Sequence, residues 1–107
     1  MTMALETANM NNAIETKLFK LGQVVMTQGI NQIIEPVSAG RVIVMGLLNR
    51  HQAGDWGDLD SEDKTANDNA VHGKDRILSS YNLLGFKVWV ITEWDRSVTT
   101  ILLPSEY

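Results

Sequence analysis

The sequence of 107 residues contains no cysteine, only two prolines and no long apolar run. Without cysteine the chain can form neither a disulfide nor a thiolate nucleophile, and zinc sites with Cys ligands are excluded. The longest apolar runs, Val42–Met45 and Val88–Ile91, are far shorter than the ~20 residues of a membrane span. The N-terminus lacks the basic and apolar regions of a signal peptide. We therefore expect a cytoplasmic protein with no membrane partner.

Positive charge is also scarce. Nine Lys and Arg residues stand against thirteen Asp and Glu residues, which gives a net charge of −4. The richest basic stretch, Lys17–Lys20, holds two lysines, too few to neutralise a nucleic-acid backbone. We therefore expect no direct binding of nucleic acid. A hydrophobic content of 44% and a charged content of 21% are typical of a folded domain of this length.

Periodicity in the first two thirds of the chain predicts helices. Residues 1–17 hold no sustained period and are interpreted as an N-terminal tail or weak helix, followed by a single domain over residues 18–107. A short helix is expected between Thr27 and Pro36, and Asp60 or Ser61 is expected to cap a polar helix of about a dozen residues that ends at Gly73. Residues 38–51 are ambiguous, because Val42–Val44 favours a strand. The spacing of Val44, Leu47, Leu48 and His51 favours a helix, with Ser38 as its cap, and we predict a helix there.

The last third predicts a β-meander. Residues 76–83, 86–93 and 98–103 are rich in β-branched and aromatic residues and are joined by tight turns. Turns at Leu84-Gly85 and Asp95-Arg96 place Arg76 directly across from Glu93. The predicted fold is α+β, with helices packed on a three-stranded antiparallel meander and with residues 23–27 as a candidate fourth strand.

The predicted register leaves an apolar strip on one face of the sheet, away from the helices. The strip consists of Leu78, Trp89, Ile91 and Leu102. A contiguous exposed apolar area usually marks an interface. We therefore expect these four residues to mediate self-association, most simply as a homodimer about a two-fold axis.

Two further stretches concentrate polar and aromatic side chains and form a candidate composite site. Its residues are His51, Asp55, Trp56, Glu93, Asp95 and Arg96. We expect His51, Trp56 and Arg96 to converge, and Arg96 to bind a carboxylate of the acidic loop. Imidazole beside a carboxylate can act as a general base, yet no nucleophile is placed to complete such a site. A histidine at a helix C-terminus is more often a cap, so we predict no catalytic residue.

Six acids lie between residues 55 and 68 and raise the question of a metal. A calcium loop that started at Asp58 would have Asp63 where glycine is needed and Asn69 where a bidentate glutamate is needed. A solvated loop and an acidic helix N-terminus explain the cluster better. We therefore predict neither a metal nor a cofactor.

Positions between residues 21 and 107 resemble a family of short uncharacterised bacterial proteins that are found on plasmids and in metagenomic DNA. The positions that agree in order are His51, Gly54-Asp55-Trp56-Gly57, Asp63, Asn67, Arg76–Tyr81, Trp89–Glu93, Asp95–Ser97, Thr99-Thr100 and Leu103–Tyr107. Members are labelled as plasmid-related proteins or as restriction-modification subunits, although this chain is too short for a methyltransferase subunit. The resemblance implies a gene on mobile DNA and little about activity.

These observations favour a non-enzymatic protein-interaction module that binds a protein partner and self-associates. One alternative is an acidic inhibitor that presents residues 55–68 as a phosphate mimic to a restriction or CRISPR enzyme. Another is a small hydrolase that uses His51 with Asp55 and Glu93.

Overall fold

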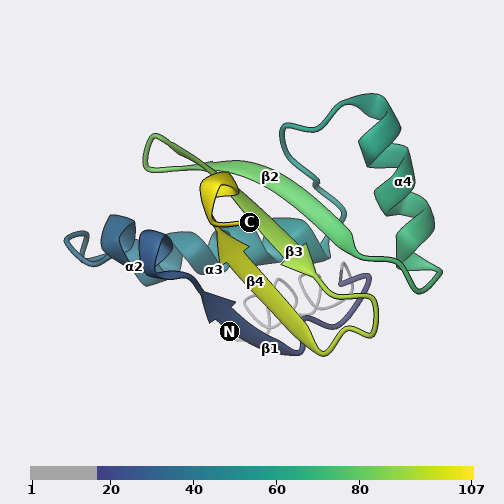
Figure 1. Ribbon diagram of the computed structural model, residues 1–107, viewed down its shortest axis with the longest axis horizontal. Coiled ribbons are helices and arrows are strands. Elements are labelled where there is room, and N and C mark those ends of the chain that lie inside the picture. The colour runs from purple at the N-terminus through teal and green to yellow at the C-terminus, as the bar shows by residue number, and fades with distance from the viewer. Residues whose placement is uncertain (1–16) are drawn as a thin grey trace, which may run out of the picture.

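The computed structural model of the chain describes residues 17–107 as an α+β fold. Its elements in chain order are β1 (Gln23–Met26), α2 (Gln28–Ile34), α3 (Gly40–Gln52), α4 (Ser61–Val71), β2 (Ile77–Leu83), β3 (Phe86–Thr92), β4 (Val98–Leu102) and the 3₁₀ turn η1 (Pro104–Glu106). The strands form one sheet with the order β1-β4-β3-β2 (Figure 1). The predicted fold class is therefore confirmed. The predicted N-terminal tail lies outside the described residues, except for Lys17.

Helix α3 lies across one face of the sheet and supplies much of the core (Figure 1). Val44, Leu47 and Leu48 share one side of the helix and are buried against residues of the three antiparallel strands. The helical interpretation of this segment is confirmed. Its predicted cap is wrong, because the helix starts at Gly40 and Ala39 occupies the N-cap without a side-chain hydrogen bond.

The strand register agrees with the sequence pattern. Tyr81 pairs with Val88, and Thr92 lies between Ile77 and Thr99. On the reverse face of the sheet, Arg76 Nε lies 4.0 Å from Glu93 Oε1, as the predicted turn positions require. The meander of β2, β3 and β4 is thus confirmed.

The candidate fourth strand is confirmed as β1, and it makes the sheet mixed, so the antiparallel pattern predicted for the meander does not extend to it. Strand β1 joins the outer edge of β4 and runs parallel to it, with Gln23 beside Val98 and Met26 beside Ile101. Parallel neighbours need a long connection rather than a hairpin, and the three α-helices of residues 17–107 lie between these two strands in the sequence.

The reverse face of the sheet is covered more completely than the sequence indicated. Ile91 and Leu102 are only 3% and 5% exposed, while Leu78 and Trp89 are half-buried. Tyr107 packs edge-on against Trp89, with ring centroids 5.7 Å apart, because η1 carries the chain end over β3. The expectation of a wholly exposed apolar strip is therefore wrong.

Candidate functional site

A chain of hydrogen bonds runs beneath α3 through the predicted site residue His51. His51 Nδ1 lies 2.6 Å from Ser79 Oγ, and Nε2 lies 2.9 Å from Thr92 Oγ1. Thr92 Oγ1 is 2.7 Å from Thr99 Oγ1, which donates to the carbonyl of Leu21 at 2.7 Å. This chain joins α3 to three strands and to the segment before β1.

The carbonyl at the end of this chain sets the direction of every proton in it. Because Thr99 donates to a carbonyl, Thr92 donates to Thr99 and His51 donates from Nε2–H to Thr92. His51 Nδ1 is then unprotonated and accepts from the Ser79 hydroxyl. His51 is fully buried, and this burial lowers its pKa to about 3. The imidazole is therefore neutral, and both of its nitrogens are occupied.

The structure brings His51, Trp56 and Arg96 around a residue that the sequence did not single out, Phe19. The Phe19 ring centroid lies 5.1 Å from that of His51 and 6.2 Å from that of Trp56. The Arg96 guanidinium carbon lies 5.9 Å from the same ring. The predicted convergence is confirmed, and it forms a packed structural cluster.

The carboxylates of the predicted composite site are dispersed among other partners. Asp55 forms an ion pair with Arg50 at 2.6 Å, and this hydrogen bond lowers the pKa of Asp55. Glu93 faces Arg76 on the reverse side of the sheet. Asp95 accepts hydrogen bonds from the backbone and hydroxyl of Ser97 and so shapes the β3–β4 turn. No single pocket therefore unites the six residues.

Arg96 binds backbone carbonyls rather than the predicted carboxylate. Its guanidinium donates to the carbonyls of Ala70 at 2.6 Å and of Asp75 at 2.7 Å. Weaker contacts reach Gly73 and the β3–β4 turn. A cation at the C-terminal end of α4 compensates its terminal carbonyls and the helix dipole. Arg96 thus ties α4 to the sheet.

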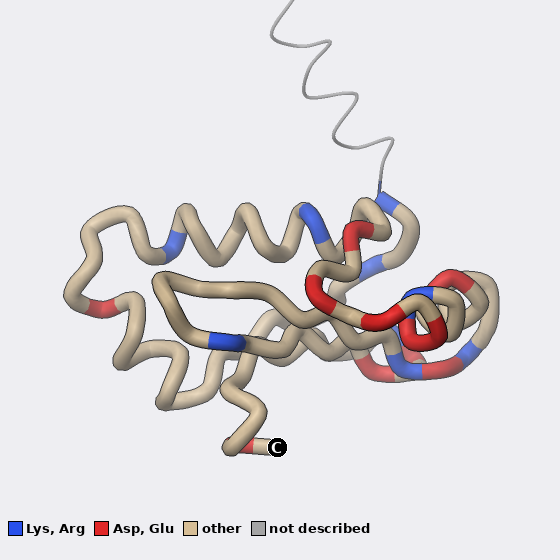
Figure 2. The backbone as a smooth tube through the Cα atoms, turned by 90° about the horizontal axis from the view of Figure 1, so that it is seen from above, with Lys and Arg blue, Asp and Glu red and all other residues tan. Residues whose placement is uncertain are grey.

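Most of the acidic positions lie at the end of the molecule formed by α4 and its preceding loop (Figure 2). Several of them have structural partners. Asp60 caps α4 by accepting from the backbone of Asp63, and Asp68 accepts from the indole N–H of the buried Trp56 at 2.9 Å. Within residues 17–107, no three His, Cys, Asp or Glu side chains are grouped for a metal ion.

One outer edge of the sheet, that of β2, is sealed by the segment between α3 and α4. The Ser80 N–H donates to the carbonyl of Trp56, and the Asp58 N–H donates to the carbonyl of Ser80. The Asn67 side chain forms two hydrogen bonds with the backbone of Leu78. The segment around Trp56 therefore covers the β2 edge of the sheet, a role that its polar composition did not predict.

The opposite edge of the sheet, that of β1, is not covered by any strand of residues 17–107. Gln23 N–H donates to Ser97 and Thr27 N–H donates to Ile101, so these alternate residues point their backbone groups toward β4. The N–H and C=O groups of Val24 and Met26 consequently point outward. Val24 and Val25 are 40% and 37% exposed.

An apolar groove runs between this edge and α3. It has a volume of about 330 Å³ and is lined by Val24, Met26, Arg41, Val44, Met45 and Leu48. Met45 and the neighbouring Val42 are 60% and 69% exposed on the helix. We call the outward edge of β1 together with this groove the β1–α3 surface.

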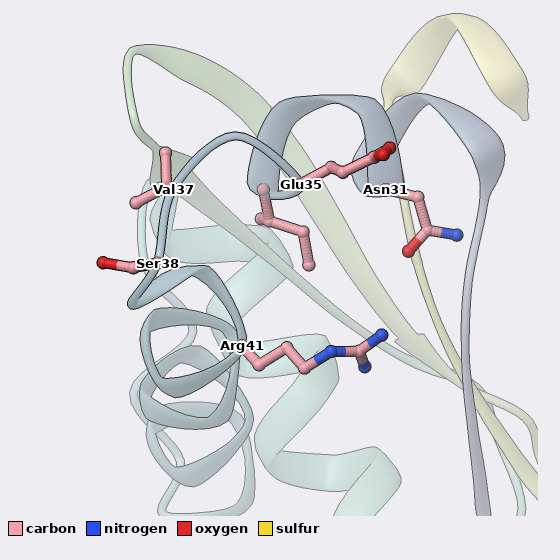
Figure 3. A pocket seen from close by; sticks show the side chains of 6 residues that line it. Asn31, Glu35, Val37, Ser38 and Arg41 are labelled. Carbon is pink, nitrogen blue, oxygen red and sulfur yellow. The ribbon is translucent and has the colours of Figure 1, made fainter.

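A second cavity of about 580 Å³ lies between α2 and α3 (Figure 3). Arg41 and Asn31 extend toward the same space from the two helices. Glu35 and Arg41 carry opposite charges, and both side chains are exposed. The charges of the lining therefore favour neither an anionic nor a cationic ligand.

Comparison of the chain with known protein families, with curated proteins and with solved structures finds no match. The resemblance to plasmid-borne proteins stays a prediction. In residues 17–107, no helix is both long and apolar enough to cross a membrane.

Proposed function

We propose that the protein is a non-enzymatic protein-interaction module encoded on mobile DNA, and that it binds an extended protein segment at the β1–α3 surface. The observation that carries this proposal is the difference between the two sheet edges. The β2 edge is sealed by Trp56–Asp58 and Asn67, whereas β1 presents outward backbone groups beside exposed apolar side chains. Addition of a strand to an open sheet edge is a recurring mode of protein recognition.

The composition of β1 supports this function. Natural edge strands are usually protected by lysine, proline, inward-pointing charges or a bulge. The strand Gln23–Met26 contains no charged residue and no proline, and its two valines are partly exposed. Within Gln23–Met26 the edge therefore carries neither the charged residues nor the proline that would hinder pairing with another strand.

The groove provides the side-chain contacts that an added strand would need. Because successive side chains of a strand alternate between its faces, every second one would turn toward Met45 and the groove. Arg41, the only charged residue in the groove lining, offers a partner for a carboxylate at one end. An extended segment with apolar side chains on one face would match the apolar lining of this surface.

The geometry around His51 supports a non-enzymatic role. A general base needs an available nitrogen and a pKa near the working pH. Both nitrogens of His51 bind neighbouring hydroxyls, and burial holds its pKa at about 3. The hydrolase alternative draws no support from this arrangement. The inhibitor alternative needs the acids of residues 55–68 to face a partner protein. Asp55, Asp60 and Asp68 instead have hydrogen-bond partners within the chain, so fewer acids support it than expected.

Substitution of Val24 by proline tests the proposed function. The N–H of Val24 points away from β4, so Val24→Pro removes an outward donor and adds a bulky ring while leaving the β1–β4 pairing intact. Random peptides displayed on phage serve as the probe. Peptides selected on the full chain should lose at least about tenfold in affinity for Val24→Pro, equal to ~1.4 kcal/mol.

Two matched variants complete this experiment. Val25→Pro should lower the melting temperature, because the N–H of Val25 points toward β4, whereas Val24→Pro should not. Phe86→Ser replaces an exposed apolar residue in β3, away from β1 in the sheet, and should leave peptide binding unchanged. Selected peptides that bind Val24→Pro as tightly as the unmodified chain would disprove the proposed function, as would a failure to select any.

A further inference from the structure

The backbone of β1 is complementary to itself. Its outward groups belong to Val24 and Met26, which flank Val25 symmetrically. In an antiparallel pair, residues that exchange two hydrogen bonds alternate with residues that exchange none. A second β1 in the opposite direction therefore places Val24 opposite Met26 of the other copy, and Val25 opposite Val25.

We infer that the strand added at β1 is β1 of a second copy of this chain; this inference rests on the proposed function. The two-fold axis passes between the two Val25 residues. Val24 N–H donates to the Met26 carbonyl of the second copy, Met26 N–H donates to its Val24 carbonyl, and symmetry repeats both bonds. Four hydrogen bonds then join two four-stranded sheets into one of eight strands.

The side chains agree with this symmetric pairing. Val25 meets its own copy on the reverse face of the sheet, and both residues are 37% exposed in the single chain. On the other face, Val24 and Met26 of each copy meet beside the apolar groove and Met45. No charged residue lies within Gln23–Met26, so the axis brings no like charges within the strand together.

The expected size of the interface sets the strength of association. Stable dimers generally bury more than about 1,200 Å² in total, and smaller interfaces are weak or transient. A strand of four residues with one helix flank offers only a small interface. The dimer should therefore form reversibly at micromolar concentration, rather than as an obligate assembly.

Cysteine substitution tests the register directly, because the full chain contains no cysteine of its own. Directly opposed residues that exchange no hydrogen bonds have Cα atoms ~4.5 Å apart, within the ~4.4–6.8 Å that a disulfide spans. Val25→Cys should therefore give a covalent dimer on mild copper-catalysed oxidation at micromolar concentration. A non-reducing gel measures the covalent dimer.

Two further variants distinguish this register from its alternatives. Val24→Cys and Met26→Cys should each give no covalent dimer alone, since two copies of either residue would lie about 8 Å or more apart. An equimolar mixture of the two should cross-link, because Val24 faces Met26 across the axis. Phe86→Cys, at an exposed site in β3, controls for random collision. Equal cross-linking of Val24→Cys, Val25→Cys and Phe86→Cys would overturn the inference.

The labelling rate of Val25→Cys by a maleimide identifies other occupants of the edge. Rapid labelling without cross-linking would show that the edge is open in a monomer, and the inferred dimer would be wrong. Slow labelling without cross-linking would assign the edge to another segment of the same chain, and would also overturn it. Peptide binding that is lost in Val24→Pro would in the first case still support the proposed function, so the two failures are distinguishable.

Discussion

At the scale of single residues, the most informative side chain is His51, because its environment decides between two chemistries. A histidine near carboxylates is a candidate base, whereas a histidine between hydroxyls is a structural linker. His51 lies between Ser79 and Thr92, and the two carboxylates expected beside it have other partners. Its role is to satisfy buried polar groups beneath α3.

This burial predicts a pH dependence of folding. The folded-state pKa of His51 is about 3, whereas its ordinary value is 6.5. Above pH 6.5 the group is neutral in both states and has no effect on stability. Between pH 6.5 and about 3 the unfolded chain binds the proton more readily, so the free energy of unfolding falls as the pH falls. The total loss is a few kcal/mol, since one pKa unit equals ~1.4 kcal/mol.

Urea unfolding between pH 7 and pH 4 measures this dependence. His51→Gln keeps a hydrogen-bonding amide but does not titrate, so its free energy of unfolding should change less steeply with pH in this range. His72→Gln alters an exposed histidine at the end of α4 and should retain the slope of the unmodified protein. An identical slope in His51→Gln would mean that His51 is not buried as a neutral group.

Residue roles were predictable where side chains signal them. The turn bond of Asp95 and the cap at Asp60 follow from the short acceptors of these residues. The partners of Arg96 were not predictable, because backbone carbonyls are present at every position and leave no mark in the sequence. Phe19 was missed for a similar reason, since a lone aromatic residue does not reveal which distant residues surround it.

At the scale of elements, the close approach of the loop before α4 to β2 depends on Gly57. Its φ is +76°, and a Cβ atom there would lie 1.9 Å from the Ser80 carbonyl oxygen. Gly85, in the β2–β3 turn, has a φ of +92° but no atom within 4 Å of such a Cβ. Both glycines therefore have a backbone conformation that disfavours a side chain, but only Gly57 also lacks room for a Cβ atom.

Alanine at these two positions separates the two effects. Gly85→Ala should cost about 1 kcal/mol, from backbone strain alone. Gly57→Ala should cost at least about 2 kcal/mol more, because the loop must move off the β2 edge and leave buried backbone groups unpaired. Chemical denaturation of the two variants measures the difference. Similar losses for both would show that the loop does not seal the edge.

The strands also differ in how well the sequence predicts their pairing partners. Tight turns link β2, β3 and β4, so the alternation of side chains and the turn positions determine their register. Strand β1 was predicted only as a candidate, because its partner β4 lies more than 70 residues away and no turn links the two. Its parallel orientation follows from the path of the intervening helices, which local periodicity does not encode.

At the scale of the whole molecule, the C-terminal turn connects distant parts of the fold. Glu106 accepts hydrogen bonds from the Thr27 hydroxyl at 2.5 Å, the Gly29 N–H at 2.9 Å and the Leu103 N–H at 2.8 Å. Tyr107 packs on Trp89 and contacts Arg76. This turn covers part of the face that the sequence had indicated as exposed, and it anchors the start of α2 next to β1.

We therefore predict that the carboxylate of Glu106 stabilises the fold where β1 leads into α2. Its hydrogen bond from Thr27, followed by the bond from Leu103, lowers the pKa of Glu106 below its ordinary value of 4.5. A group whose pKa is lowered in the folded state stabilises the fold at pH values above its ordinary pKa, and this contribution is lost as the pH falls through the folded-state pKa.

Glu106→Gln replaces one accepting oxygen by a donor, so at pH 7 it should lower the melting temperature. Glu35→Gln alters an exposed glutamate that follows α2 and should leave the melting temperature unchanged. Amide exchange at Gly29 should accelerate in Glu106→Gln, because the N–H loses its acceptor; unaltered exchange there would show that the C-terminal turn does not hold α2.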